Sequence, residues 1–476
     1  MMIEISGAKL IVALWGLGAA FLFVLVFSLV YLYFFRRDAF ALKLFLISSG
    51  AILVLSFLKA LISYFHRGYI YDRLFFYAVF SPKARGFFWL ILLSLIFILF
   101  LKFREQLERL SALKFLFFIY FIFVTFSVSV ASIREGFYGV YEPFTRAQWE
   151  YVGDLPLVKS ASDFLNRYVS LEPFLAIHSR THPPGYTLVL YFLQKYFHAG
   201  IPALSVLVVM LGGLTIFPLY YFLKNFASEE EARRGIQLFI FIPSVVMMSA
   251  TSMETVFLFF VWASISLIYL GWRKGGAWPF LGGVALYTAL FSNFLFILLA
   301  PLFLMLALIA YQQGAEFKKL VLRSALAVLG FSICYFFIYV WTGYSIVQNF
   351  FAARSFQSNF VENNFASLGV YLTYFFMNLT SFLIYLGVPT IFLFLKNLKN
   401  LFNKEKKILA LGFIMSAFFL AAGIFQGETE RIWLFLAPLF ILPITNFIKT
   451  AELSSALISL FFFETIFMQI MFYTYW

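Results

Sequence analysis

Long apolar runs dominate this chain, and they constrain its fold more than any other feature. Runs of mainly apolar residues recur from the stretch 9–35 to the stretch 453–474. An α-helix needs about 20 such residues to cross the hydrocarbon core of a bilayer. The strands of a membrane barrel would instead alternate in polarity over about 10 residues, which these runs do not do. The sequence therefore predicts an all-α polytopic membrane protein.

We expect about 12–14 transmembrane helices, since several of the apolar runs are short. Only 12% of the residues are charged and 63% are hydrophobic, whereas a soluble domain carries about 25% charged residues. The single cysteine, Cys334, lies inside an apolar run, so no disulfide within the chain and no thiol chemistry are expected. The candidate spans are 9–35, 41–65, 87–102, 115–132, 201–223, 235–250, 254–271, 277–292, 294–311, 320–341, 369–395, 408–425, 431–448 and 453–474.

Basic residues divide the connections between these spans into two sets. If the spans alternate, one set of short connections carries most of the 35 lysines and arginines. Cytoplasmic loops of membrane proteins are enriched in these residues, so we place this set in the cytoplasm. The net charge of +13 then follows from membrane topology, and nucleic acid is not an expected partner. The connections are 36–43, 102–114, 224–234, 273–274, 318–323, 396–407 and the one at Lys449.

Residues 133–200 form the one long polar interruption, and they fall on the opposite, outer side. More than half of the 22 acidic residues are expected on this side. Polar side chains that converge on one face favour a surface active site over a channel. Glu464 is an exception inside an apolar run, where ionisable residues are often functional, although it can also pair within the bundle. The acids of the loop are Glu135, Glu142, Glu150, Asp154, Asp163 and Glu172.

Short helices are expected within this outer loop. Ser160 or Ser162 is a suitable N-cap for a helix over 160–168. The Pro183-Pro184 pair can open another helix, because proline suits a first helical turn. The amphipathic stretch 186–197 is too short to span a bilayer, so we expect it to lie at the outer surface.

Two histidines in this loop, His178 and His182, have the i, i+4 spacing of metal ligands on a helix. A zinc site would need a third ligand, and the prolines after His182 disfavour a helix there, so no metal site is predicted. A divalent cation such as Mg²⁺ or Mn²⁺ is compatible with the outer acids but not required by them. The alternatives are a set of phosphate contacts that includes Arg180, or a loop that simply packs on the bundle.

Two acids of the loop are candidates for a general base. Asp154 and Glu150 lie four residues apart in EYVGDL, where Gly153 permits a tight turn. A carboxylate held near an acceptor hydroxyl can remove its proton. For most of the other loop acids, a solvated surface charge is the simpler interpretation.

Two distant segments bring further charges to the same side. Glu254 in ATSMETVF begins a span, where it also suits the helix macrodipole. Glu428, Glu430 and Arg431 in QGETERIWLFLAP begin another span. An arginine at this depth is well placed for a lipid phosphate, although Glu428 and Arg431 can also form a local salt bridge.

These segments resemble the GT-C class of integral membrane glycosyltransferases, which use polyprenyl-phosphate-linked sugars. The resemblance rests on an acid in the outer loop (Asp154 or Glu150), on His182-Pro183-Pro184, on Glu254 and on Arg431. It covers residues 115–450, and it implies that the loop acid is the base and that Arg431, with His178, Arg180 or His182, holds the donor phosphate. Glu254, Glu428 and Glu430 are expected in the same donor- and substrate-binding site. In the class the large loop usually follows the first span, whereas here it follows the fourth, so residues 1–114 are expected to be extra helices.

The resemblance implies transfer of a sugar from a polyprenyl-phosphate donor to a lipid or glycan acceptor, with inversion. The implied location is a prokaryotic cytoplasmic membrane with the site facing outward, and 451–476 is expected to form a last span. One alternative is a flippase or other transporter, which would predict broken helices and polar residues at mid-bilayer. Another is a glycan polymerase or ligase, which also has a large outer loop.

Overall fold

The computed structural model describes residues 7–65, 75–360, 363–397, 409–445, 448 and 450–474. Helices account for 81% of the structure, and the strands described are the short β1 (Ala78–Phe80) and β2 (Phe472–Thr474). Ten helical segments of the described chain are long and apolar enough to cross a membrane. The predicted all-α polytopic membrane architecture is therefore confirmed.

The ten spanning segments follow the longest apolar runs. Two of them are made of two consecutive helices each, and the other eight are single helices. They are α1 (Gly7–Phe35), α2 (Ala39–Phe65), α4 (Phe87–Glu108), α5 (Ala112–Glu135), α10 (Ile201–Gly213) with α11 (Ile216–Leu223), α14 (Glu254–Lys274), η4 (Phe294–Leu299) with α16 (Ala300–Gln312), α17 (Phe317–Thr342), α19 (Leu368–Leu386) and α24 (Ala451–Met471).

The remaining expected spans are shorter or broken. The run 235–250 divides at Pro243, which sits in the first turn of the second helix. The run 369–395 divides at Gly387, whose φ of 88° suits glycine and ends the first helix. These segments are α12 (Glu229–Phe239), α13 (Pro243–Ser249), α15 (Trp278–Ser292), α20 (Val388–Asn397), α21 (Leu409–Ala422), α22 (Thr429–Ile432), η6 (Leu434–Leu436) and α23 (Ala437–Thr445).

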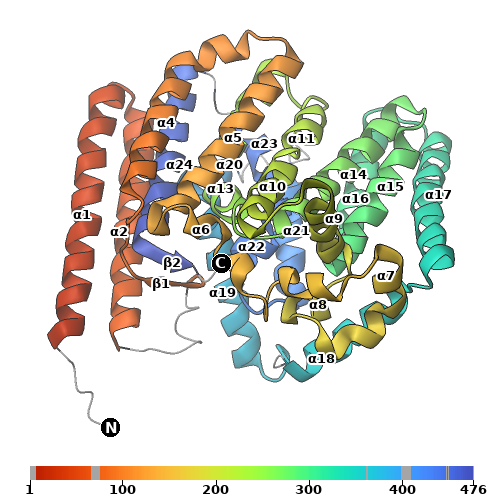
Figure 1. Ribbon diagram of the computed structural model, residues 1–476. Coiled ribbons are helices and arrows are strands. Elements are labelled where there is room, and N and C mark those ends of the chain that lie inside the picture. The colour runs from red at the N-terminus through yellow and green to blue at the C-terminus, as the bar shows by residue number, and fades with distance from the viewer. Residues whose placement is uncertain are drawn as a thin grey trace.

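The two edges of the bundle are built differently. In Figure 1, α1 and α2 lie at one edge beside α24, and α14, α15 and α17 form the other. Phe27 of α1 stacks on Phe463 of α24 at 4.2 Å between ring centroids. The antiparallel pair β1 and β2 joins the same two ends of the chain. The N-terminal helices are thus attached to the bundle chiefly through its last span.

One end of the bundle carries the short helices of the polar loop, and we call this end the loop face. Figure 1 shows α7, α8 and α18 below the spans, with α6 and α9 higher, near α10. Ser160 caps α7 by accepting a hydrogen bond from the Asp163 N–H, and α9 begins directly after Pro184, as the sequence predicts. The elements are α6 (Tyr138–Tyr141), η1 (Pro143–Thr145), η2 (Tyr151–Leu157), α7 (Ala161–Leu171), η3 (Glu172–Phe174), α8 (Ile177–Thr181), α9 (Gly185–Phe197) and α18 (Ile346–Phe360).

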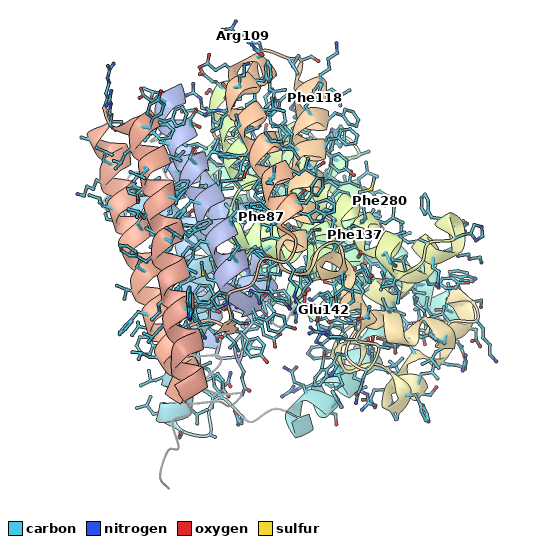
Figure 2. All side chains as sticks on the ribbon, turned by 60° about the vertical axis from the view of Figure 1, so that its left-hand side comes forward. Phe87, Arg109, Phe118, Phe137, Glu142 and Phe280 are labelled. Atoms are coloured by element: carbon cyan, nitrogen blue, oxygen red, sulfur yellow. The ribbon has the colours of Figure 1, made fainter. Side chains whose placement is uncertain are left out.

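The opposite end carries the basic connections, and we call it the basic face. Figure 2 shows Arg109 at the top of the molecule and Glu142 in its lower half, with Phe118 at a height between them. The Phe118 side chain is exposed. Exposed aromatic side chains on the flank of a helical bundle are suited to contact lipid tails. Of the expected basic connections, residues 398–408 and Lys449 lie outside the described residues.

Glu464 is buried near the middle of α24, next to the break between α19 and α20. Its Oε2 accepts a hydrogen bond from the Val388 N–H at 3.1 Å. Val388 is the first residue of α20, so the carboxylate satisfies one of the N–H groups that a helix start leaves open. Glu464 therefore interacts within the bundle, which is one of the two interpretations of its sequence position.

Candidate functional site

A cluster of buried charges lies at the loop face, with Arg431 at its centre. The Arg431 guanidinium lies 2.8 Å from Glu428 Oε2 and 3.6 Å from Glu254 Oε1. The Arg431 and Glu254 side chains are only 7% and 5% exposed, whereas Glu428 is 22% exposed. These charges come from segments more than 170 residues apart in the sequence, and the fold brings them together as the sequence predicts.

The turn that carries Arg431 is fixed by α19. Asn378 of α19 accepts a hydrogen bond from the Gly427 N–H at 2.8 Å and donates one to the Phe425 carbonyl at 2.8 Å. Glu428 then adopts a left-handed conformation with φ of 63°, which is uncommon for a residue other than glycine. Such strain is found at sites whose surroundings determine the backbone, and here it directs the Glu428 carboxylate onto Arg431.

Glu254 enters the cluster as the first residue of α14. It follows the bend between α13 and α14, which turns the chain at the loop face. The positive end of the helix macrodipole stabilises a carboxylate at this position. Burial would otherwise disfavour the charge, so Arg431 and the helix start together hold Glu254 in place.

Glu150 and His178 form the second half of the cluster. His178 Nδ1 lies 3.3 Å from Glu150 Oε1. The two segments are tied together, since the N–H groups of Ile177 and His178 donate to the carbonyls of Gln148 and Trp149. Burial alone would lower the pKa of His178, but the charge of Glu150 and its hydrogen bond outweigh this effect and raise the pKa. His178 is thereby favoured as a cation beside Arg431.

His182 has the opposite protonation preference. Its Nδ1 lies 2.8 Å from the His178 carbonyl oxygen, so Nδ1 donates and Nε2 is left as an acceptor. Burial lowers the pKa of His182 to about 4, and the nearby Glu254 only partly offsets this effect. His182 is therefore neutral near pH 7 and suited to accept a proton or a hydrogen bond rather than to bind a phosphate as a cation.

Two tyrosines that the sequence did not single out complete the cluster. The Tyr151 ring lies 5.0 Å from the Tyr186 ring and 5.9 Å from each of the His178 and His182 rings. Burial, and next the charge of Glu254, raise the pKa values of both phenols, so they stay protonated donors. Their positions in the sequence are the one signal that could have identified these tyrosines as site residues. Tyr151 follows Glu150 directly, and Tyr186 comes two residues after Pro184.

The segment from His182 to Gly185 packs closely on α15, and this contact requires the glycine. A Cβ on Gly185 would overlap the carbonyl oxygen of Phe291 at the end of α15. The absence of a side chain lets the start of α9 approach this backbone closely. His182 and Tyr186 are thus held on either side of a tight contact with the bundle.

Asp154 is not brought into the charge cluster. It is 1% exposed, and its Oδ1 accepts a hydrogen bond from the Ala176 N–H at 2.7 Å. Burial raises the pKa of Asp154, although hydrogen bonds from Ser179 and Ala176 limit the change. A general base must reach its substrate. Asp154 instead joins η2 to the start of α8 and so positions Glu150 and His178.

Arg180 and Glu430 make hydrogen bonds to groups outside the charge cluster. Arg180 donates to the carbonyls of Leu175 and Pro173, and its guanidinium lies over the Phe356 ring at 5.1 Å. Glu430 is fully buried and accepts a hydrogen bond from Ser381 Oγ at 2.6 Å. Burial raises the pKa of Glu430 to about 7. The donor- or substrate-binding roles expected of these two residues do not fit these contacts.

The cluster can do two things chemically. Arg431 and protonated His178 offer two cationic donors for a phosphate, and Glu150 offers a partly exposed carboxylate for proton transfer. In the described part of the chain, no group of three or more His, Cys, Asp or Glu side chains is placed to hold a metal ion.

A comparison of the sequence with known protein families finds no matching family model, and a search of curated proteins finds no relative. The function must accordingly be inferred from the membrane fold and from the charge cluster itself.

Proposed function

We propose that this protein is a membrane glycosyltransferase of the GT-C type. It transfers a sugar from a polyprenyl-phosphate donor to a lipid or glycan acceptor at the loop face. The membrane that we propose is a prokaryotic cytoplasmic membrane, with the loop face outward. The proposal fits a bundle whose basic connections and polar loop lie at opposite ends.

One observation carries this proposal: Arg431, Glu254, Glu150 and the His178–His182 pair meet at one end of a membrane bundle. A buried arginine with a planar guanidinium binds phosphate oxygens in a bidentate manner. Its present partner Glu428 is the most exposed acid of the cluster, so it is the one that a phosphate can displace most easily. The cluster thus has a place for the phosphate of a lipid donor at the membrane edge.

The reaction can be written with the residues of the cluster. Glu150 removes the proton of the acceptor hydroxyl, whose oxygen attacks the anomeric carbon of the sugar. The bond between this carbon and the phosphate oxygen breaks, and the phosphate leaves with the electron pair. Arg431 and protonated His178 stabilise the charge that develops on the leaving phosphate. A single direct displacement inverts the configuration of the anomeric carbon.

The donor half of this proposal can be tested by thermal protection of the purified protein. A ligand that binds only the folded state raises the melting temperature in a saturable way. We expect a short polyprenyl phosphate to protect the wild-type protein and to lose this effect in Arg431→Ala. Lys319→Ala is a matched control, because Lys319 is an exposed cation on the basic face that pairs with Glu316. No protection of the wild-type protein would contradict the proposal.

A lipid-linked glycan transporter is the second candidate, and the environment of Glu464 favours it. A buried carboxylate at the break between α19 and α20 resembles the broken helices at which transporters bind ions. Transport predicts that Glu464→Gln abolishes function, whereas sugar transfer at the loop face predicts a much smaller effect. A transfer assay on this variant separates the two functions.

A further inference from the structure

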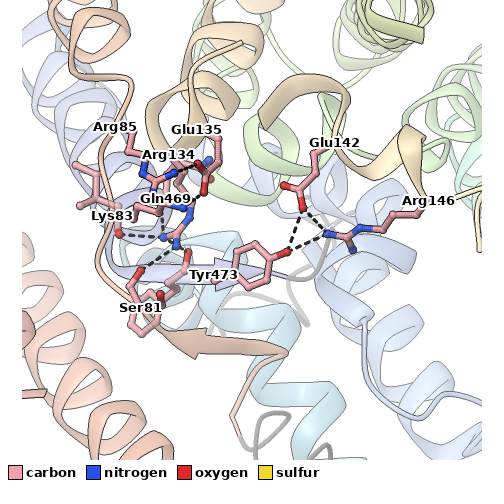
Figure 3. A network of polar contacts seen from close by, with 11 residues as sticks. Ser81, Lys83, Arg85, Arg134, Glu135, Glu142, Arg146, Gln469 and Tyr473 are labelled. Carbon is pink, nitrogen blue, oxygen red and sulfur yellow. Dashed lines mark hydrogen bonds and ion pairs between the residues drawn. The ribbon is translucent and has the colours of Figure 1, made fainter. Parts of the chain in front are cut away.

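Charged pairs at the loop face mark the level at which the hydrocarbon of the membrane ends. Glu135 at the end of α5 pairs with Lys83 and Arg85. Further along the chain Arg146 lies 2.9 Å from Glu142, and Figure 3 shows both groups. Charged side chains are costly in hydrocarbon, so these pairs belong to the headgroup region or to the water beyond it. The loop-face end of α5 therefore marks the edge of the hydrocarbon layer.

On another flank of the bundle, the span α17 leads directly into α18, which lies below the spans in Figure 1. α17 ends at Thr342, and residues 343–345 alone separate it from the start of α18 at Ile346. Trp341 is exposed in the last turn of α17, and tryptophan is enriched where membrane spans meet the headgroups. The first turn of α18 therefore lies at the membrane interface.

One face of α18 is exposed, and it is apolar at its beginning and polar at its end. Val347 and Phe351 are 53% and 60% exposed. Arg354 and Ser358 are also exposed, and they continue the same face because residues three and four apart lie on one side of a helix. This pattern suits a helix that rests on a lipid surface, with its first turns deeper than its last.

The opposite face of α18 packs on the short helices α7 and α8. The Phe356 ring lies 5.1 Å from the guanidinium carbon of Arg180 on α8. Asn349 is buried and accepts a hydrogen bond at 2.8 Å from the hydroxyl of Tyr344, whose ring lies 6.1 Å from the Tyr168 ring on α7. α18 is thus held against the polar loop on one side and is open on the other.

Tyr168 connects this contact to the segment that carries the two histidines of the charge cluster. Its hydroxyl donates to the Ser179 carbonyl at 2.8 Å and to the His182 carbonyl at 3.0 Å. Both carbonyls belong to the end of α8, whose second residue is His178. The position of α18 therefore bears on the backbone that places His178 and His182.

We propose that α18 is an interfacial helix whose exposed face lies on the phospholipid leaflet at the loop face. Val347 and Phe351 enter the boundary between headgroups and acyl chains, and Arg354 lies among the lipid phosphates. Lipid is the occupant of this face because the face continues directly from a membrane span and combines apolar side chains with a cation. The inference does not depend on the proposed transferase activity, and it gives the histidine segment a support on the membrane surface.

The test is the depth of spin labels on the full-length protein in phospholipid nanodiscs. In a Cys334→Ser background, labels at Val347→Cys and Phe351→Cys are compared by power-saturation EPR for collisions with oxygen, which dissolves in lipid, and with a water-soluble nickel chelate. Phe337→Cys on the exposed flank of α17 is the lipid reference, and Ser170→Cys, exposed on α7, is the water reference. We expect both α18 labels to lie about 5–10 Å inside the leaflet, protected from the chelate as at Phe337→Cys.

Two results would overturn the proposal. Collisions with the chelate at Val347→Cys and Phe351→Cys that match those at Ser170→Cys would place the face in water. Low collision rates with both reagents, together with spin–spin broadening that disappears on dilution with unlabelled protein, would show that a second copy of the chain covers it. Both residues are exposed, so the substitutions remove little packing, and the second position keeps the test available if one variant is unstable.

Discussion

Glu150 and Asp154 show how four residues of separation lead to two different roles. In an α-helix this spacing would place both carboxylates on one face. The segment instead forms the 3₁₀ stretch η2, with three residues per turn, so the two side chains point in different directions. Asp154 turns inward to the Ala176 N–H, and Glu150 faces His178. The sequence could supply both candidates but could not choose between them.

Glu428 competes with the donor phosphate for Arg431, and its removal should strengthen donor binding. We expect Glu428→Gln to tighten the binding of a polyprenyl phosphate about tenfold, because a carboxylate 2.8 Å from the guanidinium is replaced by a neutral group. Titration followed by thermal protection measures the change. Asp163→Asn, which removes a loop-face carboxylate outside the cluster, should leave the affinity unaltered. Weaker binding in Glu428→Gln would show that this acid holds Arg431 in place instead of competing.

The two histidines predict a pH dependence of donor binding. The pKa of His178 is raised above 6.5, so its charge is fully present below that value and is lost as the pH rises through the raised pKa. A phosphate monoester is already mostly dianionic above pH 7, since its second pKa is near 6. Affinity for polyprenyl phosphate should therefore fall about tenfold as the pH rises through the raised pKa of His178.

His178→Gln and His182→Gln provide the control for this dependence. The fall in affinity should disappear in His178→Gln. It should persist in His182→Gln, because His182, with a pKa of about 4, is neutral throughout this range. A dependence that follows His182 would reverse the two assigned roles.

At the scale of elements, the sequence predicts those features whose physical cause lies in neighbouring residues. The Ser160 cap and the start of α9 after Pro184 depend on the residues themselves. The convergence of Glu254 and Arg431 was expected from topology alone. The tie between α19 and the Arg431 turn through Asn378 could not be predicted, because it depends on contacts between segments that lie about 50 residues apart.

The close contact between α9 and α15 predicts the effect of a single added methyl group. Gly185→Ala should lower stability by about 1–3 kcal/mol, because the new Cβ meets the backbone oxygen of Phe291, which cannot move aside easily. Thermal unfolding measures this loss. Gly50→Ala is the control, since no atom lies within 4 Å of a Cβ at Gly50. Equal melting temperatures for the two variants would mean that α9 can shift without cost.

At the scale of the whole molecule, the fold separates the basic face from the loop face. The apolar runs were enough to predict a helical membrane bundle. They could not predict that several spans would be broken, since the breaks depend on Pro243 and Gly387 in their packed surroundings. They also could not show that α1 and α2 would pack on α24, more than 380 residues away in the chain.

The single native cysteine makes the orientation of the bundle measurable. In a Cys334→Ser background, a membrane-impermeant maleimide should label Ser170→Cys on intact cells, because Ser170 is exposed on the loop face. Arg109→Cys on the basic face should react only after the cells are permeabilised. The reverse pattern would place the charge cluster in the cytoplasm and contradict the proposed orientation.

The most direct test of the account is sugar transfer by the purified protein in liposomes. The substrates are a polyprenyl-phosphate-linked sugar and a methyl glycoside acceptor, and the variants are Glu150→Gln and Asp154→Asn. We predict that Glu150→Gln slows transfer by about 10²–10⁴-fold, the usual contribution of a general base, with protection by polyprenyl phosphate intact. Transfer at the wild-type rate in Glu150→Gln, with a folded but inactive Asp154→Asn, would contradict the account.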